Sequence, residues 1–295
     1  MKEGANLEAN GLSAVTDWLE GLAETHPLTR QARSVVRTLV ANQRLASYSS
    51  IREIANVANV SIGTVTRTAQ ALGFAGWPAL QEELRALYLS SLSATEVAAH
   101  RTGTQDRPSY ASITRDRDNL NTLVKSIDLD QLVRVAGMIA AANRTFIVAT
   151  GSFNGIGQIL AHTGWLHGYD VRLLSEEAQV VNTIANARED DLVIVISFWR
   201  LYESSFQAIQ SCHEAGRQVV LLTETVTREI EEQCTECIRI PSEGTGFAPS
   251  LTSATAVIHG IVAELIALNP ERATELLRNA EREWERFQLM HRYSS

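Results

Sequence analysis

The sequence predicts two domains: an all-α head built around a helix-turn-helix, and an α/β domain with a five-stranded, mostly parallel sheet and helices on both faces. Between residues 28 and 73 three amphipathic helical patterns follow one another, and about three residues separate the last two. From residue 146 onward, strand-like apolar runs alternate with helical patterns, as in a parallel sheet covered by helices. The chain of 295 residues accommodates both domains at roughly 100–200 residues each.

The composition is that of an ordinary globular protein, with 45% hydrophobic and 20% charged residues. No run of about 18 uncharged apolar residues is present; the nearest, 254–268, carries His259 and Glu264. The acidic N-terminus has no apolar core of the kind found in signal peptides, and three cysteines are too few for a disulfide framework. These features predict a cytoplasmic protein that does not bind a membrane.

Charge is distributed unevenly along the chain. Residues 28–90 contain seven Arg and three Glu, a net of +4, whereas residues 129–268 contain eight Arg and sixteen acidic residues, a net of −8. A basic segment within a chain of net charge −8 suits contact with phosphates. A solvated basic face without a partner is the alternative.

The head is expected to begin with amphipathic helices at about 1–26 and 28–41, followed by a polar break at 42–44. Ser50 and Glu53 then fit a capping box, in which each side chain accepts a hydrogen bond from the other residue's backbone N–H. The helix that they open should end near Asn59, because asparagine tolerates the left-handed conformation of tight turns.

The following helix is predicted to start at the cap Ser61, to end at Gly73, and to place Ile62, Val65, Ala69 and Leu72 inside. The two short helices would form a helix-turn-helix at about 50–73, whose second helix lies in the major groove. Arg67 could fork onto a guanine or hold a phosphate. The predicted DNA contacts are Arg44, Ser50, Arg52, Ser61, Gly63, Thr64, Thr66, Arg67 and Gln70. A three-helix bundle that does not bind DNA is the alternative.

A family resemblance strengthens this interpretation. Residues 60–67 (VSIGTVTR) and 72–77 (LGFAGW) resemble the N-terminal domain of RpiR/MurR-type bacterial regulators. That family joins a DNA-binding domain to a sugar isomerase (SIS) domain, which the rest of the chain resembles. The resemblance implies a regulator that binds an inverted-repeat operator in double-stranded DNA and a small-molecule effector, with no catalytic residue and no cofactor. The alternatives are a sugar-phosphate isomerase-like enzyme and an interaction module that does not bind DNA.

The helical periodicity of apolar residues fades in the segment 91–112, which we therefore predict to be a linker. The predicted head is then 1–90 and the predicted SIS-like domain is 113–295. Helices are expected at about 113–126 and 129–142. Strands are then expected at 146–149, 171–174, 192–196, 219–222 and 238–240, alternating with helices at about 154–167, 176–187, 203–215, 228–234 and 250–268.

Ligands of parallel sheets bind at the carboxyl ends of strands, where loops meet helix N-termini. Loops 150–155 and 197–203 occupy such places, and in SIS domains that bind sugar phosphates both are rich in Ser, Thr and Gly. Phe153 and Trp199 would fill the space that a phosphate normally occupies. The guanidinium of Arg200 and the phenol of Tyr202 instead suit a planar or carboxylate-bearing effector rather than a simple sugar phosphate. The predicted ligand residues are Gly151, Ser152, Phe153, Asn154, Ser197, Trp199, Arg200, Tyr202 and Ser250. Loss of ligand binding, with the second loop at a subunit interface, is the alternative.

Two further patterns bear on metals and partners. Cys234 and Cys237 have C-x-x-C spacing but neither a second cysteine pair nor a nearby histidine, so structural thiols and no metal site are predicted. A last helix at about 270–292 would place Leu276, Ala280, Trp284 and Phe287 on one side. Because helix-turn-helix proteins usually bind two half-sites symmetrically, we expect a homodimer or tetramer.

Overall fold

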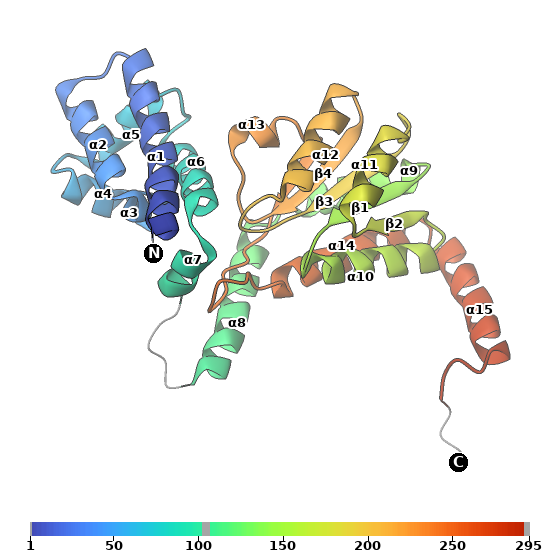
Figure 1. The fold of residues 1–295 in the computed structure, drawn as a ribbon. Coiled ribbons are helices and arrows are strands. Elements are labelled where there is room, and N and C mark those ends of the chain that lie inside the picture. Colours follow the sequence, from blue (N-terminus) through green and yellow to red (C-terminus); the bar gives the residue numbers. More distant parts are fainter. Residues whose placement is uncertain (1, 102–106, 292–295) are drawn as a thin grey trace. The chain divides into compact units, whose positions relative to one another are not determined.

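The computed structural model describes residues 2–101 and 107–291, which separate into a helical unit and an α/β unit (Figure 1). The helices described for the helical unit are α1 (Lys2–Thr25), α2 (Arg30–Ala41), α3 (Gln43–Tyr48), α4 (Ile51–Val57), α5 (Ile62–Ala71), α6 (Trp77–Ser91) and α7 (Ala94–Arg101). Their core consists of fully buried apolar side chains, among them Leu19, Val35, Leu39, Ile54, Val65, Leu80 and Leu84. The predicted all-α head is therefore confirmed.

Two stretches of this unit differ from the sequence prediction. The polar break expected at 42–44 shrinks to Asn42, because α3 begins at Gln43 and packs against α6. The expected linker 91–112 contains α7, which a second capping box begins: Ser93 N–H donates to Glu96 Oε2 (2.7 Å) and Glu96 N–H donates to Ser93 Oγ (3.3 Å). Residues 102–106 of that linker lie outside the described residues.

The α/β unit is built on five parallel strands: β1 (Thr145–Ala149), β2 (Val171–Leu174), β3 (Leu192–Ile196), β4 (Gln218–Thr223) and β5 (Glu236–Arg239). Their order is β2-β1-β3-β4-β5, so the chain starts near the middle of the sheet and builds outward in both directions. The three central strands contain buried residues throughout, except Gln218 at the start of β4, as expected for a sheet covered on both faces. The predicted five-stranded sheet is confirmed.

Helices cover both faces of this sheet (Figure 1). One layer contains α9 (Leu129–Ala141), α10 (Phe153–Leu166) and α14 (Thr252–Leu268), and the other contains α11 (Glu177–Ala185) and α12 (Glu203–Glu214). The remaining helices are α8 (Pro108–Ser126), which packs against α14, α13 (Arg228–Glu231) and α15 (Pro270–Arg286). Pro108 therefore starts a helix at a position that was expected in the linker.

None of the described helices alone combines the length and apolarity of a transmembrane span; α14 and α15 reach that length and apolarity only as a pair, with a bend of 104° between them.

Candidate functional site

The connection between α4 and α5 has the geometry of a helix-turn-helix. The Ser50–Glu53 capping box is present, with Ser50 N–H donating to Glu53 Oε2 (2.9 Å) and Glu53 N–H donating to Ser50 Oγ (3.3 Å). Asn59 adopts φ +51° and Val60 N–H donates to the carbonyl of Ala55 (2.9 Å), which closes the turn. Ser61 then caps α5 by accepting from Thr64 N–H (3.1 Å). The predicted caps and left-handed turn are confirmed.

The far end of α5 is equally well defined. Gly73 adopts φ +91°, Gly73 N–H donates to the carbonyl of Gln70 (3.1 Å), and Phe74 N–H donates to the carbonyl of Ala69 (3.1 Å). This pair of bonds is a Schellman motif, which favours glycine at the left-handed position. Gly73 therefore ends the helix, as predicted.

The exposed face of α5 differs from the prediction at two positions. Thr64 is only 8% exposed, and its hydroxyl bonds to the hydroxyl of Ser61 (2.9 Å), so its side chain belongs to the cap and not to the free face. Ile62, predicted to lie inside, is 43% exposed. The helical period gives the direction of each side chain, but α5 extends past its packing partners at this end. The exposed face consists of Ile62, Gly63, Arg67 and Gln70.

The Arg67 guanidinium folds back over the first turn of α5. A Cβ on Gly63 would stand 3.3 Å from Arg67 Nη1, and Arg67 Nη2 lies 3.5 Å from Thr64 Oγ1. Within the described residues Arg67 has no ion-pair partner. A charged donor group is therefore presented at the end of the helix that enters the major groove.

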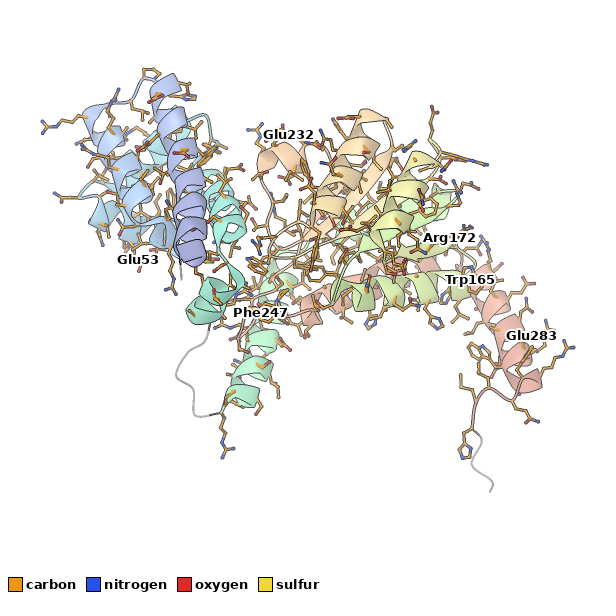
Figure 2. All side chains as sticks on the ribbon, viewed as in Figure 1. Glu53, Trp165, Arg172, Glu232, Phe247 and Glu283 are labelled. Atoms are coloured by element: carbon orange, nitrogen blue, oxygen red, sulfur yellow. The ribbon has the colours of Figure 1, made fainter. Side chains whose placement is uncertain are left out.

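The other predicted DNA contacts lie around this face at varying exposure. Arg44 on α3 and Arg52 on α4 are exposed. Thr66 is half-buried and its hydroxyl donates to the carbonyl of Ile62 (3.3 Å). Ser50 donates two hydrogen bonds to Glu53 (labelled in Figure 2), one from its backbone N–H and one from its hydroxyl. These bonds, the backbone one most strongly, hold the pKa of Glu53 below its ordinary value.

A second candidate site lies at the carboxyl ends of β1 and β3, which are neighbours in the sheet. Gly151 adopts φ +62°, and both Gly151 and Ser152 are exposed. The first backbone donors of α10 are already engaged, because Phe153, Asn154 and Gly155 N–H groups donate to the carbonyls three residues earlier (3.2–3.3 Å). These three amides are therefore not free to form an anion nest around a phosphate.

Two residues predicted to bind a ligand here point into the protein instead. Phe153 is 5% exposed and packs edge-on against Phe198 and Tyr202, with ring centroids 5.6 and 6.3 Å away. Ser197 is 1% exposed and its hydroxyl donates to the carbonyl of Arg200 (3.1 Å). Aromatic burial and closure of the loop determine these positions, and a ligand role for either residue stays a prediction.

The residues after Ser197 form the outer part of this site. Trp199 adopts φ +67°, an uncommon conformation for a residue with a side chain, and the guanidinium carbon of Arg200 lies 4.3 Å from the Trp199 ring centroid. Tyr202 is partly exposed, and its hydroxyl lies 3.4 Å from where a Cβ on Gly151 would stand. We call the group Gly151, Ser152, Trp199, Arg200 and Tyr202 the loop site.

Asn154 lies next to the loop site. Its side chain is half-buried, and its Oδ1 atom is shielded from solvent without a hydrogen-bond partner among the described residues. A buried amide oxygen normally finds a donor. Asn154 is thus an acceptor at the start of α10 whose hydrogen-bonding capacity is still available.

Ser250, the remaining ligand prediction, has another role. Its hydroxyl donates to Asp116 Oδ1 (2.5 Å), and the hydroxyl of Thr252 donates to Asp116 Oδ2 (2.8 Å). Asp116 on α8 therefore supplies a carboxylate at the N-terminus of α14, where negative charge is favoured. The sequence shows no local signal for this pairing, because its partners are 134 and 136 residues apart.

The cysteine motif shows no metal-site geometry. Cys212, Cys234 and Cys237 are free thiols, and no group of three His, Cys, Asp or Glu side chains suitable for a metal occurs among the described residues. Burial, followed by the nearby carboxylate of Glu231, raises the pKa of Cys234 to about 12. A thiol held in this state is a poor nucleophile and a poor metal ligand.

Known families match both units. The helix-turn-helix domain of the rpiR family matches residues 22–91, and the SIS domain matches residues 138–265. Among curated proteins, the uncharacterized HTH-type transcriptional regulator YfhH of Escherichia coli K12 is 21% identical over 282 residues, which cover 92% of this chain and 97% of YfhH. An uncharacterized HTH-type regulator of Clostridium perfringens is 22% identical over 66% of this chain and 71% of its own length.

Solved structures give the same picture of the fold. The sugar isomerase domain of an RpiR transcription factor from Sphaerobacter thermophilus is 25% identical and matches 60% of this chain and 99% of its own, with a TM-score of 0.57. The NanR protein of Vibrio vulnificus, solved with ManNAc-6P, is 18% identical and matches 94% of this chain and 100% of its own, with a TM-score of 0.60. The combination of both domains in one chain is thus present in known structures.

Proposed function

We propose that this chain, a DNA-binding transcriptional regulator of the RpiR family with an rpiR-type helix-turn-helix and a ligand-sensing SIS domain, binds an inverted-repeat operator through α5 and its effector at the loop site. The observation that carries the DNA half is the exposed Arg67 over Gly63 at the N-terminal end of α5. The N-terminal residues of the second helix are those that reach base edges.

Gel shift and fluorescence anisotropy with the protein's own promoter region test this proposal. Binding should weaken steeply with salt, because each phosphate contact releases counterions. Arg67→Ala should abolish sequence-specific binding and leave the oligomeric state unchanged. Binding that is insensitive to salt, or specific binding that survives the substitution, would contradict the assignment.

For the effector, we propose a carboxylate-bearing or planar molecule rather than a simple sugar phosphate. The amide donors at the start of α10 are engaged, whereas Arg200 stacked on Trp199 offers a charged fork and an aromatic face. The hydroxyls of Ser152 and Tyr202 and the unpartnered Oδ1 of Asn154 would complete the polar contacts.

The competing candidate is a phosphosugar, since the structural neighbour NanR is complexed with ManNAc-6P. Calorimetry against matched panels of phosphosugars and carboxylates distinguishes the two. Arg200→Ala should remove carboxylate binding, and Arg200→Lys should not restore it, because an ammonium cannot make the bidentate contact. Tight phosphosugar binding that survives Arg200→Ala would disprove the proposal.

We further propose that the SIS domain is a sensor without turnover. Glu176 and Glu177, the carboxylates that follow β2 and that an isomerase could use as general bases, lie exposed at the start of α11, and a base in water lacks the environment that tunes catalytic groups. An isomerase assay on aldose and ketose phosphates tests this statement. Measurable turnover that is lost on Glu177→Gln would overturn it.

The proposed assembly is a homodimer or tetramer formed by the α/β unit. Only Ala273 is buried among the residues of α15, while Phe287 beyond its end is 76% exposed and Trp165 on α10 is 74% exposed (Figure 2). Aromatic residues are enriched at protein–protein interfaces, and a symmetric operator calls for a symmetric partner. Light scattering of the purified chain measures its mass directly.

Through such an assembly an effector can regulate DNA binding only if it binds one arrangement of the two heads more tightly than another. A coupling of ~1–3 kcal/mol is typical, which corresponds to a change in operator affinity of roughly 5- to 150-fold. Anisotropy titrations with and without effector measure this factor.

A further inference from the structure

The first turn of α5 presents an apolar and a cationic group beside one glycine. Ile62 is the first residue of the helix and is 43% exposed. Gly63 follows, and the Arg67 guanidinium lies against the space that a Cβ on Gly63 would occupy, 3.3 Å from Nη1. Helical side chains lean toward the helix N-terminus, so the Arg67 side chain from the next turn lies against residue 63, where a Cβ would displace it by a few tenths of an ångström.

The electrostatics of this position favour an external acceptor. A cation near a helix N-terminus faces the positive end of the helix dipole. The one hydrogen bond described for Arg67, to Thr64 Oγ1, has a length of 3.5 Å, at the weak limit for such a bond. Within the described residues no carboxylate compensates the guanidinium. An acceptor brought to this face from outside would therefore gain a strong charge-assisted bond.

The chemistry of the two side chains identifies what they can read. In the major groove, an arginine fork matches the O6 and N7 acceptors of guanine, and an apolar side chain contacts the C5 methyl group of thymine. Ile62 cannot bond to a phosphate, so its exposure is not explained by backbone contacts. The Arg67 guanidinium lies against Gly63, the residue next to Ile62, so the groups that Arg67 and Ile62 contact should be adjacent bases.

We infer that Ile62 and Arg67, both exposed on α5, read a guanine next to a thymine in each half-site, with Gly63 acting as a positioning residue because its missing side chain leaves room for the Arg67 guanidinium. The inference rests on the proposed function, because it requires that α5 enters the major groove. It assigns a specificity role to Ile62, and it explains why the residue between the two readers has no side chain.

The test begins with the full-length protein and a pool of random duplex DNA, from which the bound sequences are selected. Anisotropy then measures affinity for the selected site, for the same site with deoxyuridine in place of the thymine, and for the site with 7-deazaguanine in place of the guanine. Deoxyuridine removes only the methyl group, and 7-deazaguanine removes only the N7 acceptor.

The expected results form two double-mutant cycles, each of which combines one base analogue with one protein variant. Deoxyuridine should weaken binding by the wild type about three- to fivefold, the factor that one buried methyl group gives, and should not weaken Ile62→Ala further. Deazaguanine should weaken the wild type by at least fivefold, whereas Arg67→Ala should bind the selected site and its deazaguanine analogue with the same residual, non-specific affinity. Val57→Ala serves as the control, because Val57 at the end of α4 is also an exposed aliphatic residue (51%); it should respond to deoxyuridine as the wild type does.

Gly63→Ala tests the positioning role. Alanine raises helix propensity, and the flexible Arg67 side chain need move only a few tenths of an ångström, so this variant should fold and melt no lower than the wild type. It should nevertheless lose at least fivefold in affinity for the selected site and keep its affinity for random DNA. Gly21→Ala on α1, where a Cβ has nothing within 4 Å, should change neither affinity.

The outcomes separate the inference from the function beneath it. If the wild type binds no duplex in a salt-dependent manner, the proposed function fails. If it selects a site at which neither base analogue matters, or if Gly63→Ala binds that site as tightly as the wild type, the proposed function stands and this inference fails.

Discussion

Replacing Asp191 by asparagine is expected to lower the free energy of unfolding of the α/β unit by about 3 kcal/mol. The Asp191 carboxylate, immediately before β3, is fully buried and accepts hydrogen bonds from Arg144 Nε (3.0 Å), Arg144 Nη2 (2.5 Å) and the backbone N–H of Arg188 (2.7 Å). Asparagine has the same shape as aspartate, but its amide group replaces one carboxylate oxygen by an NH2 donor. That donor would face the N–H donors of Arg144 and Arg188. Breaking a buried ion pair costs about 3–5 kcal/mol, and the lower value applies because Arg144 remains 25% exposed.

The chain offers a matched control in Asp170. Arg172 (Figure 2) forks onto Asp170 with the same two nitrogens, at 2.7 and 2.6 Å, but the two side chains are 54% and 35% exposed. An exposed pair of this kind contributes about 0–1 kcal/mol. Urea unfolding at pH 7 should therefore separate Asp191→Asn clearly from Asp170→Asn. Equal stabilities for the two variants would refute the argument from burial.

The same contacts predict a pH dependence. Burial alone would raise the pKa of Asp191, but the bonds from Arg144 and from Arg188 N–H outweigh it and hold the pKa below its ordinary value. A carboxylate with a lowered folded-state pKa contributes its stability above the unfolded pKa of about 3.9, and that contribution is lost as the pH falls through the folded value. The difference between wild type and Asp191→Asn should thus persist at pH 5 and shrink below pH 4. A difference that grows in acid would disprove this account.

Three other predictions concern function and chemistry. Raising salt from 50 to 200 mM should weaken operator binding by the wild type about 10³-fold or more if six phosphates are contacted, and Arg52→Ala should reduce that slope. Phe287→Glu should shift the chain toward monomer in light scattering without lowering its melting temperature, since Phe287 is 76% exposed. Cys234, whose pKa burial raises to about 12, should resist alkylation at pH 8 until the protein is unfolded; rapid labelling of the native protein would contradict this.

Features that depend on a few consecutive residues were predictable from the sequence. The capping box at Ser50, the left-handed turn at Asn59 and the C-cap at Gly73 each follow from the chemistry of one or two side chains and from helix spacing. The strands were predictable for a related reason, because a buried parallel strand is a continuous apolar run whatever its neighbours.

Features that depend on distant partners could not be read in the same way. Helical periodicity assigned Ile62 to the core, yet no neighbour covers that end of α5 fully. Phe153 and Ser197 lie in loops that by position suggest ligand contact, but the rings of Phe198 and Tyr202 and the loop's own carbonyl decide where their side chains point. The role of Ser250 depends on Asp116, whose distance in sequence left no local signal.

The bonds from Asp116 to Ser250 and Thr252 also determine where the sensor can be separated from the head. The SIS match begins at residue 138, but a fragment starting there would lack α8 and the carboxylate that α8 brings to the first turn of α14. It would also lose Leu123 and Leu132, two buried residues of the core of the α/β unit. A soluble, ligand-competent sensor fragment should therefore start no later than Pro108, and α8 should be treated as the first helix of that fragment in any domain exchange between regulators.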